Sequence, residues 1–164
     1  MKNQIVNIDY EGLWSHIESN FALLLSSWHG PQHWRRVEQF GVKLANENGA
    51  DITVVRLFAV IHDSKRLDEG EDHGHGLRGA AHAEQLRGHW FEIDDERFSL
   101  LYEAIARHAD GRTSDNLTIG TCWDADRLDL GRVGISPSAK YLSTDEAKKY
   151  IPPRKTYFLE APHK

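Results

Sequence analysis

Residues 52–61, ITVVRLFAVI, form an almost uninterrupted apolar stretch that runs directly into His62 and Asp63. The β-branched residues at its start also suit a strand, but its length and the preceding Asp51, a preferred helix N-cap residue, favour a helix. On that helix His62 shares a face with Phe58 and therefore points into the core. A buried polar or charged group is costly unless it is paired. The fold must therefore provide a partner for these two side chains at the end of a buried helix.

The rest of the chain repeats the 3.6-residue period of amphipathic helices, and the strict alternation that marks strands is scarce. We expect further helices over about 11–27, 32–48, 75–90, 94–109 and 115–130, and a short one in TDEAKKY at 144–150. Glycine and proline mark the turns between them. The sequence therefore predicts an all-α fold, a single helical bundle of about six main helices.

Length, charge and cysteine content exclude several classes of protein. The 164 residues suit one domain, and a formal net charge of −5 provides no basic face for a nucleic-acid polymer. No apolar run is long enough to span a membrane, and the first ten residues lack the apolar core of a signal peptide. Cys122, the one cysteine, cannot form an internal disulfide, which agrees with a cytoplasmic location. The five tryptophans leave room for a buried dimer face, so a homodimer is compatible with the composition.

Three other polar side chains fall on the apolar faces of expected helices, as His62 does. They are His33, His108 and Asp126, each near the end of a different helix. Taken singly, an inward histidine is most simply a hydrogen-bonded core residue, and an aspartate at a helix end is a solvated cap. Taken together, they indicate a divalent cation, which binds neutral imidazole nitrogens and ionised carboxylate oxygens. The donor set suits Mn²⁺, Fe²⁺, Co²⁺, Ni²⁺, Zn²⁺ or Mg²⁺ and does not select among them.

The order His33, His62-Asp63, Asp126 resembles the H…HD…D signature of the HD-domain metal-dependent phosphohydrolases. Three segments carry the resemblance, which are HWRRV at 33–37, LFAVIHDSKR at 57–66 and DADRLDL at 124–130. It covers about residues 28–131. It therefore implies one HD-type domain with its core in that range and a C-terminal tail at 132–164.

Two further segments resemble an extended form of the signature that holds two metal ions. HGLRGAA at 75–81 provides His75, and AIARH at 104–108 provides His108. The resemblance implies that His33, His62, Asp63 and Asp126 bind a first metal ion. Asp63 would bridge to a second ion held by His75 and His108. With one metal ion, these last two histidines would face the phosphate of the substrate instead.

The resemblance implies hydrolysis of a small phosphomonoester or nucleotide, with one or two divalent metal ions activating water. Asp63 is the expected proton acceptor, and the basic residues Lys65 and Arg66 directly after it are expected to neutralise the phosphate. Further cationic candidates beside the motifs are Arg78, Arg107 and Arg112. Two alternatives stay open. One is a non-catalytic ligand-binding or regulatory domain with a structural metal ion, and the other is a di-iron oxygenase of the HD type.

Several remaining polar residues near the motifs have weaker interpretations. The pair Glu71-Asp72 resembles the catalytic acids of guanosine-tetraphosphate hydrolases in the wider HD superfamily, but a solvated acidic loop explains it as well. His82 is a reserve ligand, and His29 is expected to be a turn residue because Gly30 and Pro31 follow it. We expect no role for His73 and His89.

Overall fold

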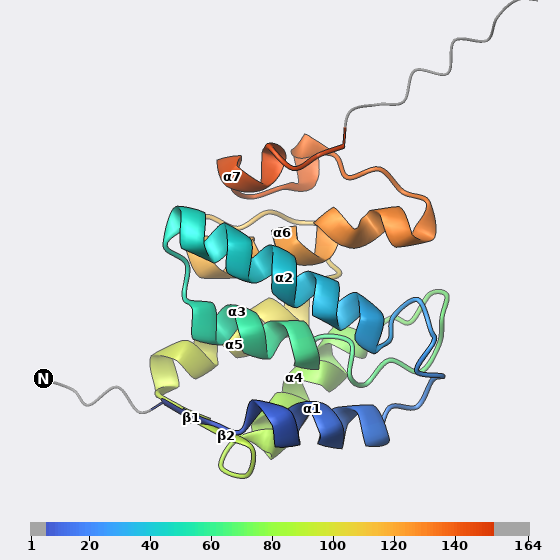
Figure 1. Cartoon of the computed structure of the whole chain (residues 1–164), viewed down its shortest axis with the longest axis vertical. Helices are drawn as coiled ribbons and strands as arrows, with labels where there is room; N and C mark the ends of the chain where they lie inside the picture. Colours follow the sequence, from blue (N-terminus) through green and yellow to red (C-terminus); the bar gives the residue numbers. More distant parts are fainter. Residues whose placement is uncertain (1–5, 153–164) are drawn as a thin grey trace, which may run out of the picture.

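The computed structural model describes residues 6–152 and confirms the all-α class (Figure 1). The elements in chain order are β1 (Val6–Ile8), α1 (Tyr10–Ser19), α2 (Pro31–Asn48), α3 (Ile52–Ile61), α4 (His75–Leu86), β2 (Phe91–Ile93), α5 (Asp95–Arg107), α6 (Leu117–Leu128), the 3₁₀ helices η1 (Asp129–Val133) and η2 (Ala139–Tyr141), and α7 (Asp145–Lys148). None of the helices within this range is both long enough and apolar enough to cross a bilayer.

Helix α3 lies at the centre of the bundle, in contact with α1, α2, α4, α5 and α6 (Figure 1). Every side chain from Leu57 to Ile61 is fully buried, which explains why the segment is so apolar. The helix begins where the Asp51 side chain accepts hydrogen bonds from the backbone N–H groups of Thr53 and Val54. Because the helix is fixed at its start and its last five residues are buried on every side, the direction of His62 at its end is also fixed.

Helices α2 and α6 lie side by side on one side of α3, and α4 packs against α5 on the other (Figure 1). Helix α2 starts with Pro31 at its first position and ends at Gly49, whose φ of 85° is in the left-handed region that favours glycine. These boundaries agree with the range of 32–48 expected from the sequence. The start of α2 and the ends of α3 and α6 come to the same part of the molecule.

The expected helix over 11–27 is too long. Helix α1 ends at Ser19. The side-chain amide of Asn20 then donates from Nδ2 to the carbonyl of His16 at 2.8 Å, which satisfies an acceptor left free at the helix end. Consecutive turns then carry the chain to the start of α2. Leu24 and Leu25 are exposed, so the apolar run LLL that suggested a continuing helix has no core to face.

Helix α4 is also shorter than expected, because the chain turns at Gly88 (φ 84°) and enters a strand. Strand β2 pairs antiparallel with β1, with Val6 opposite Ile93 and Ile8 opposite Phe91. The sequence analysis expected no strands. Three-residue strands are too short to show the alternation that would have revealed them.

Helix α6 ends at Leu128, two residues before the expected limit, and continues as the 3₁₀ helix η1. The segment after η1 folds back to α6 and α2 and includes α7, the short helix expected in TDEAKKY. Its anchor is the buried Asp124, whose carboxylate accepts hydrogen bonds from the backbone of Ser143 and from both the backbone and hydroxyl of Thr144. The expected tail beyond residue 152 lies outside the described residues.

Helix α4 approaches α5 and the end of α3 closely because two of its residues lack a side chain. A Cβ atom on Gly76 would lie 2.8 Å from the carbonyl oxygen of Ala106, and one on Gly79 would lie 2.8 Å from the carbonyl oxygen of His62. Backbone atoms cannot move aside as a flexible side chain can. The two glycines therefore allow His75, the first residue of α4, to reach the end of α5.

The substitution Gly76→Ala should lower the free energy of unfolding by about 1–3 kcal/mol, because the added methyl group overpacks the α4–α5 contact. Urea unfolding followed by circular dichroism measures the change. The matched control is Gly131→Ala, since no atom lies within 4 Å of the position of the added methyl group. The control should stay within about 1 kcal/mol of the wild type. Equal stability of Gly76→Ala and the control would contradict the close approach.

Candidate metal centre

Six ligand-type side chains from five helical segments meet in the interior. His33 lies in the first turn of α2, His62 and Asp63 at the end of α3, His75 at the start of α4, His108 at the end of α5, and Asp126 in the last turn of α6. The side chains of His33 and His62 are completely buried, and that of Asp63 is 3% exposed. The helix ends, rather than the helix middles, therefore form this cluster.

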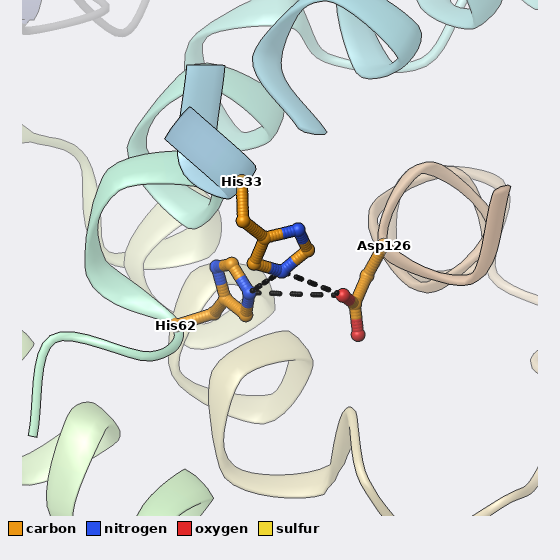
Figure 2. A group of neighbouring side chains, drawn as sticks. All are labelled: His33, His62 and Asp126. Atoms are coloured by element: carbon orange, nitrogen blue, oxygen red, sulfur yellow. Dashed lines mark hydrogen bonds and ion pairs between the residues drawn. The ribbon is translucent and has the colours of Figure 1, made fainter. Parts of the chain in front are cut away.

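The first group consists of His33, His62 and Asp126, and Figure 2 shows the three side chains pointing toward one another. The Nε2 atoms of the two histidines lie 3.2 Å apart. The Oδ1 atom of Asp126 lies 3.1 Å from His33 Nε2 and 3.8 Å from His62 Nε2. Oδ2 of Asp63 lies 3.5 Å from His62 Nε2, so this carboxylate borders the first group.

The second group is built from His75 and His108, together with the other oxygen of Asp63. The two histidine Nε2 atoms lie 2.9 Å apart. Oδ1 of Asp63 lies 3.4 Å from each of them. Because Oδ2 faces the first group and Oδ1 faces the second, the carboxylate of Asp63 lies between the two groups.

The hydrogen bonds of the outer ring nitrogens determine the tautomer of all four histidines. Each Nδ1 atom faces an oxygen that can only accept, namely Asp129 Oδ2 for His33 (2.7 Å), the Ala59 carbonyl for His62 (3.0 Å), the Asp72 carbonyl for His75 (2.6 Å) and the Ile105 carbonyl for His108 (2.7 Å). Each Nδ1 must therefore carry the proton in the neutral ring. The lone pairs of the four Nε2 atoms then converge on the carboxylates of Asp63 and Asp126.

An arrangement of lone pairs and carboxylates at these distances is repulsive without a cation between them. The Oδ1 atom of Asp63 shows the consequence, because it is buried and has no hydrogen-bond partner among residues 6–152. Neutral imidazole nitrogens and ionised carboxylates are also the donors that divalent transition-metal ions bind. The residues therefore fit a metal centre, and both groups could hold an ion.

Two of the histidines are held in the neutral form by their surroundings. Burial lowers the pKa of His62 to about 4, against the opposing charges of Asp63 and Asp126. Burial and then the charge of His108 lower the pKa of His75. These two imidazoles are available as ligands without losing a proton at neutral pH.

For the other two histidines and for the carboxylates, the neighbouring groups outweigh the effect of burial on the pKa. Burial alone would lower the pKa of His33, but the hydrogen bonds with Asp126 and Asp129 outweigh it and raise the pKa. Burial also acts to lower the pKa of His108, and the adjacent carboxylate of Asp63 raises it. Burial alone would raise the pKa of Asp63 and Asp126, but the neighbouring imidazoles outweigh it and lower both. Protons therefore compete with a metal ion for the Nε2 atoms of His33 and His108.

The guanidinium of Arg66 faces the second group. Its Nη1 atom lies 3.2 Å from His75 Nε2 and 3.8 Å from Asp63 Oδ1. Nε and Nη2 donate to the carbonyl oxygens of Asp68 and Gly70, so the backbone of the following loop holds the side chain in this direction. A cavity of about 530 Å³ opens beside Arg66 and His75.

Lys65, the other expected phosphate-binding residue, lies close enough to His82 to influence its titration. Its charge acts on His82, whose pKa is lowered to about 4 by burial first and then by Lys65 and His16. His82, the reserve ligand, lies outside both groups and bonds Ser64 Oγ through Nδ1 at 2.9 Å. The structure therefore brings Arg66, but neither Lys65 nor His82, to the predicted centre.

The remaining cationic candidates are already paired. Arg78 bonds Asp72 and the carbonyl of Lys65, and Arg107 and Arg112 both pair with Asp110. The carboxylate of Asp72 bonds Arg78 and the backbone N–H of Leu67, and so it stabilises the loop. Glu71 is exposed and lines the cavity beside Arg66. His73 is exposed beside Glu71 and lines the same cavity.

Two residues of the centre were missed by the sequence analysis. His29, expected to be a turn residue, is in a turn, but its Nδ1 atom lies 3.3 Å from Asp63 Oδ2 and its Nε2 atom 3.2 Å from the carbonyl of Glu69. Asp129 accepts the hydrogen bond from His33 Nδ1 and was not singled out. The only sequence signal for Asp129 is its position inside the DADRLDL segment, three residues after Asp126.

The comparisons with known proteins support the fold. No protein-family model and no curated protein sequence matches the chain. The structure is similar to the crystal structure of a predicted HD superfamily hydrolase from an uncultured Thermotogales bacterium, with a TM-score of 0.71. The two are 24% identical in sequence, over 87% of this chain and 83% of that chain. The chain therefore has the HD-domain fold, which confirms the resemblance at the level of the fold.

The affinity of the centre for Co²⁺ should fall by at least about tenfold between about pH 8 and about pH 6. The raised pKa values of His33 and His108 keep protons on these ligands at pH values where an ordinary histidine has lost them. As the pH falls, protons therefore displace the metal ion, and as it rises, the ligands become free. Competition against a chelator of known affinity at each pH measures the change. An affinity that stays constant over this range would contradict the assignment of these ligands.

Proposed function

We propose that this protein is a metal-dependent phosphohydrolase that acts on a small phosphomonoester or a nucleotide. The observation that carries the proposal is the convergence of four histidine Nε2 atoms on the two oxygens of Asp63 and on Asp126. The similarity to a protein described as a predicted HD superfamily hydrolase supports the same class of activity.

His33, His62, Asp63 and Asp126 would hold a first divalent ion, and Asp63, His75 and His108 would hold a second if two bind. The bound metal would supply Lewis-acid chemistry, which makes water more acidic and polarises a phosphoryl oxygen. The donor set contains no thiolate, and it leaves Mn²⁺, Fe²⁺, Co²⁺, Ni²⁺, Zn²⁺ and Mg²⁺ as candidates.

Asp63 would accept the proton of the attacking water. Its carboxylate lies between the two groups, and its lowered pKa keeps it ionised. His29 contacts its Oδ2 atom and so limits its rotation. An ionised and oriented carboxylate beside the metal centre can accept a proton, but its lowered pKa makes it a weaker base than a group whose pKa lies near the working pH.

Arg66 would bind the phosphate. Backbone carbonyls orient its guanidinium, and its Nη1 atom faces the second group from the side of the cavity. A guanidinium binds phosphate oxygens through directed, charge-assisted hydrogen bonds. The phosphate would therefore lie between Arg66 and the metal centre, with the rest of the substrate in the cavity.

Asp63→Asn should lower kcat/KM by at least about 10²-fold, because the amide cannot accept a proton from water and is a weaker ligand. The assay is hydrolysis of p-nitrophenyl phosphate and a panel of nucleotides, with each candidate metal ion in turn. Wild-type protein that carries a metal ion but hydrolyses no member of the panel would contradict the proposal. Iron content combined with consumption of oxygen would indicate the oxygenase alternative instead.

Arg66→Met should lower kcat/KM by about 10- to 100-fold, mainly through KM, since a hydrogen bond to a charged group contributes about 1.5–3 kcal/mol. The matched control is Lys65→Met, which removes the neighbouring charge that acts on His82. The control should retain activity within about threefold. Equal losses in the two variants would show that general charge, and not the position of Arg66, attracts the substrate.

A further inference from the structure

The imidazole of His33 is held between two carboxylates. On one side its Nε2 atom lies 3.1 Å from Asp126 Oδ1, and on the other its Nδ1 atom lies 2.7 Å from Asp129 Oδ2. Asp129 is the first residue of η1 and follows Asp126 by three residues. Since His33 is fully buried and Asp129 is 7% exposed, solvent has little access to this contact.

This contact differs from those of the other three histidines in the centre. The Nδ1 atoms of His62, His75 and His108 face uncharged backbone carbonyls, whereas that of His33 faces a carboxylate. Asp129 also forms a salt bridge with the guanidinium of Arg36, as an ionised carboxylate does. An ionised acceptor on one ring nitrogen makes the other nitrogen more basic and fixes its direction.

Asp129 is itself held in place by two arginines. Arg36 Nε donates to its Oδ1 atom at 2.7 Å, and Arg132 Nη1 donates to its backbone carbonyl at 3.1 Å. Oδ1 is therefore committed to Arg36, and Oδ2 is directed at His33. The carboxylate of Asp129 is therefore held in one orientation, and its hydrogen bond with Nδ1 orients the imidazole of His33.

We propose that Asp129 is a positioning residue, which holds His33 as the Nδ1-protonated tautomer and thereby strengthens the binding of the metal ion in the first group. The proposal rests on the proposed metal-dependent function and adds the residue that prepares one of its ligands. Asp129 acts through His33 alone, because it lies on the side of the ring opposite Asp126.

The affinity for Mn²⁺, measured by isothermal titration calorimetry, tests the proposal without reference to activity. Removal of an outer-shell carboxylate typically weakens metal binding by about 10- to 100-fold. We expect the neutral isostere Asp129→Asn near the lower end of this range and Asp129→Leu near the upper end. Arg35→Leu is the control, because Arg35 lies on the same helix but pairs with Glu18 rather than with Asp129. The control should bind Mn²⁺ within about threefold of the wild type.

The ¹⁵N NMR spectrum of the histidine rings in the metal-free protein gives a second readout. At a pH high enough for the ring to be neutral, His33 of the wild type should carry its single proton on Nδ1, and in Asp129→Asn the Nε2-protonated tautomer should become populated. A folded Asp129→Asn protein shows this even if Asp129→Leu fails to fold. Wild-type affinity in the folded variants, or a neutral His33 ring that carries its proton on Nε2 in the wild type, would overturn the proposal.

Asp63→Ala separates this proposal from the proposed function. If Asp63→Ala loses Mn²⁺ but the Asp129 variants bind it as the wild type does, the metal centre stands and the role of Asp129 is wrong. If Asp63→Ala also binds Mn²⁺ as the wild type does, the metal centre is not where the geometry indicates, and both proposals fail.

Discussion

The meeting of four imidazole lone pairs with the carboxylates of Asp63 and Asp126 is the constraint on which the rest of the structure depends. Such a cluster is unfavourable in a buried place unless a cation balances it. The cluster forms because five helical segments begin or end at the same part of the molecule, so that their side chains approach one point. The outer nitrogens of His62 and His108 bond backbone carbonyls in the last turns of α3 and α5, so these contacts satisfy helix-end acceptors and also direct the ligands.

The surrounding elements each fix one part of this cluster. The burial of α3 and its Asp51 cap determine the direction of His62, and Gly76 and Gly79 allow α4 to bring His75 to α5. The turns after α1 return the chain so that His29 reaches Asp63, and the loop after α3 aims Arg66 at the second group. The small sheet and α7 lie farther from the centre (Figure 1).

Helical periodicity was enough to predict the all-α class and most of the helices, because an inward histidine is visible as a break in an apolar stripe. His33, His62, His108 and Asp126 were identified in this way, and the structure brings them together. Contacts made by loops have no such period, which is why His29 was assigned to a turn alone. Asp129 was missed because its partner is 96 residues away. The loop contacts that hold Arg66 at the second group could not be predicted either, because Asp68 and Gly70 bind it through backbone carbonyls, which leave no trace in the sequence.

The most direct measurement is the anomalous difference density of crystals grown with Mn²⁺, recorded near the manganese absorption edge. The account predicts a peak inside the first group, in contact with His33 Nε2, His62 Nε2 and Asp126, and bordered by Asp63. A second peak between Asp63, His75 and His108 would show that two ions bind. Crystals that hold manganese elsewhere, with no peak within the first group, would contradict the central claim that these helix ends form a metal centre.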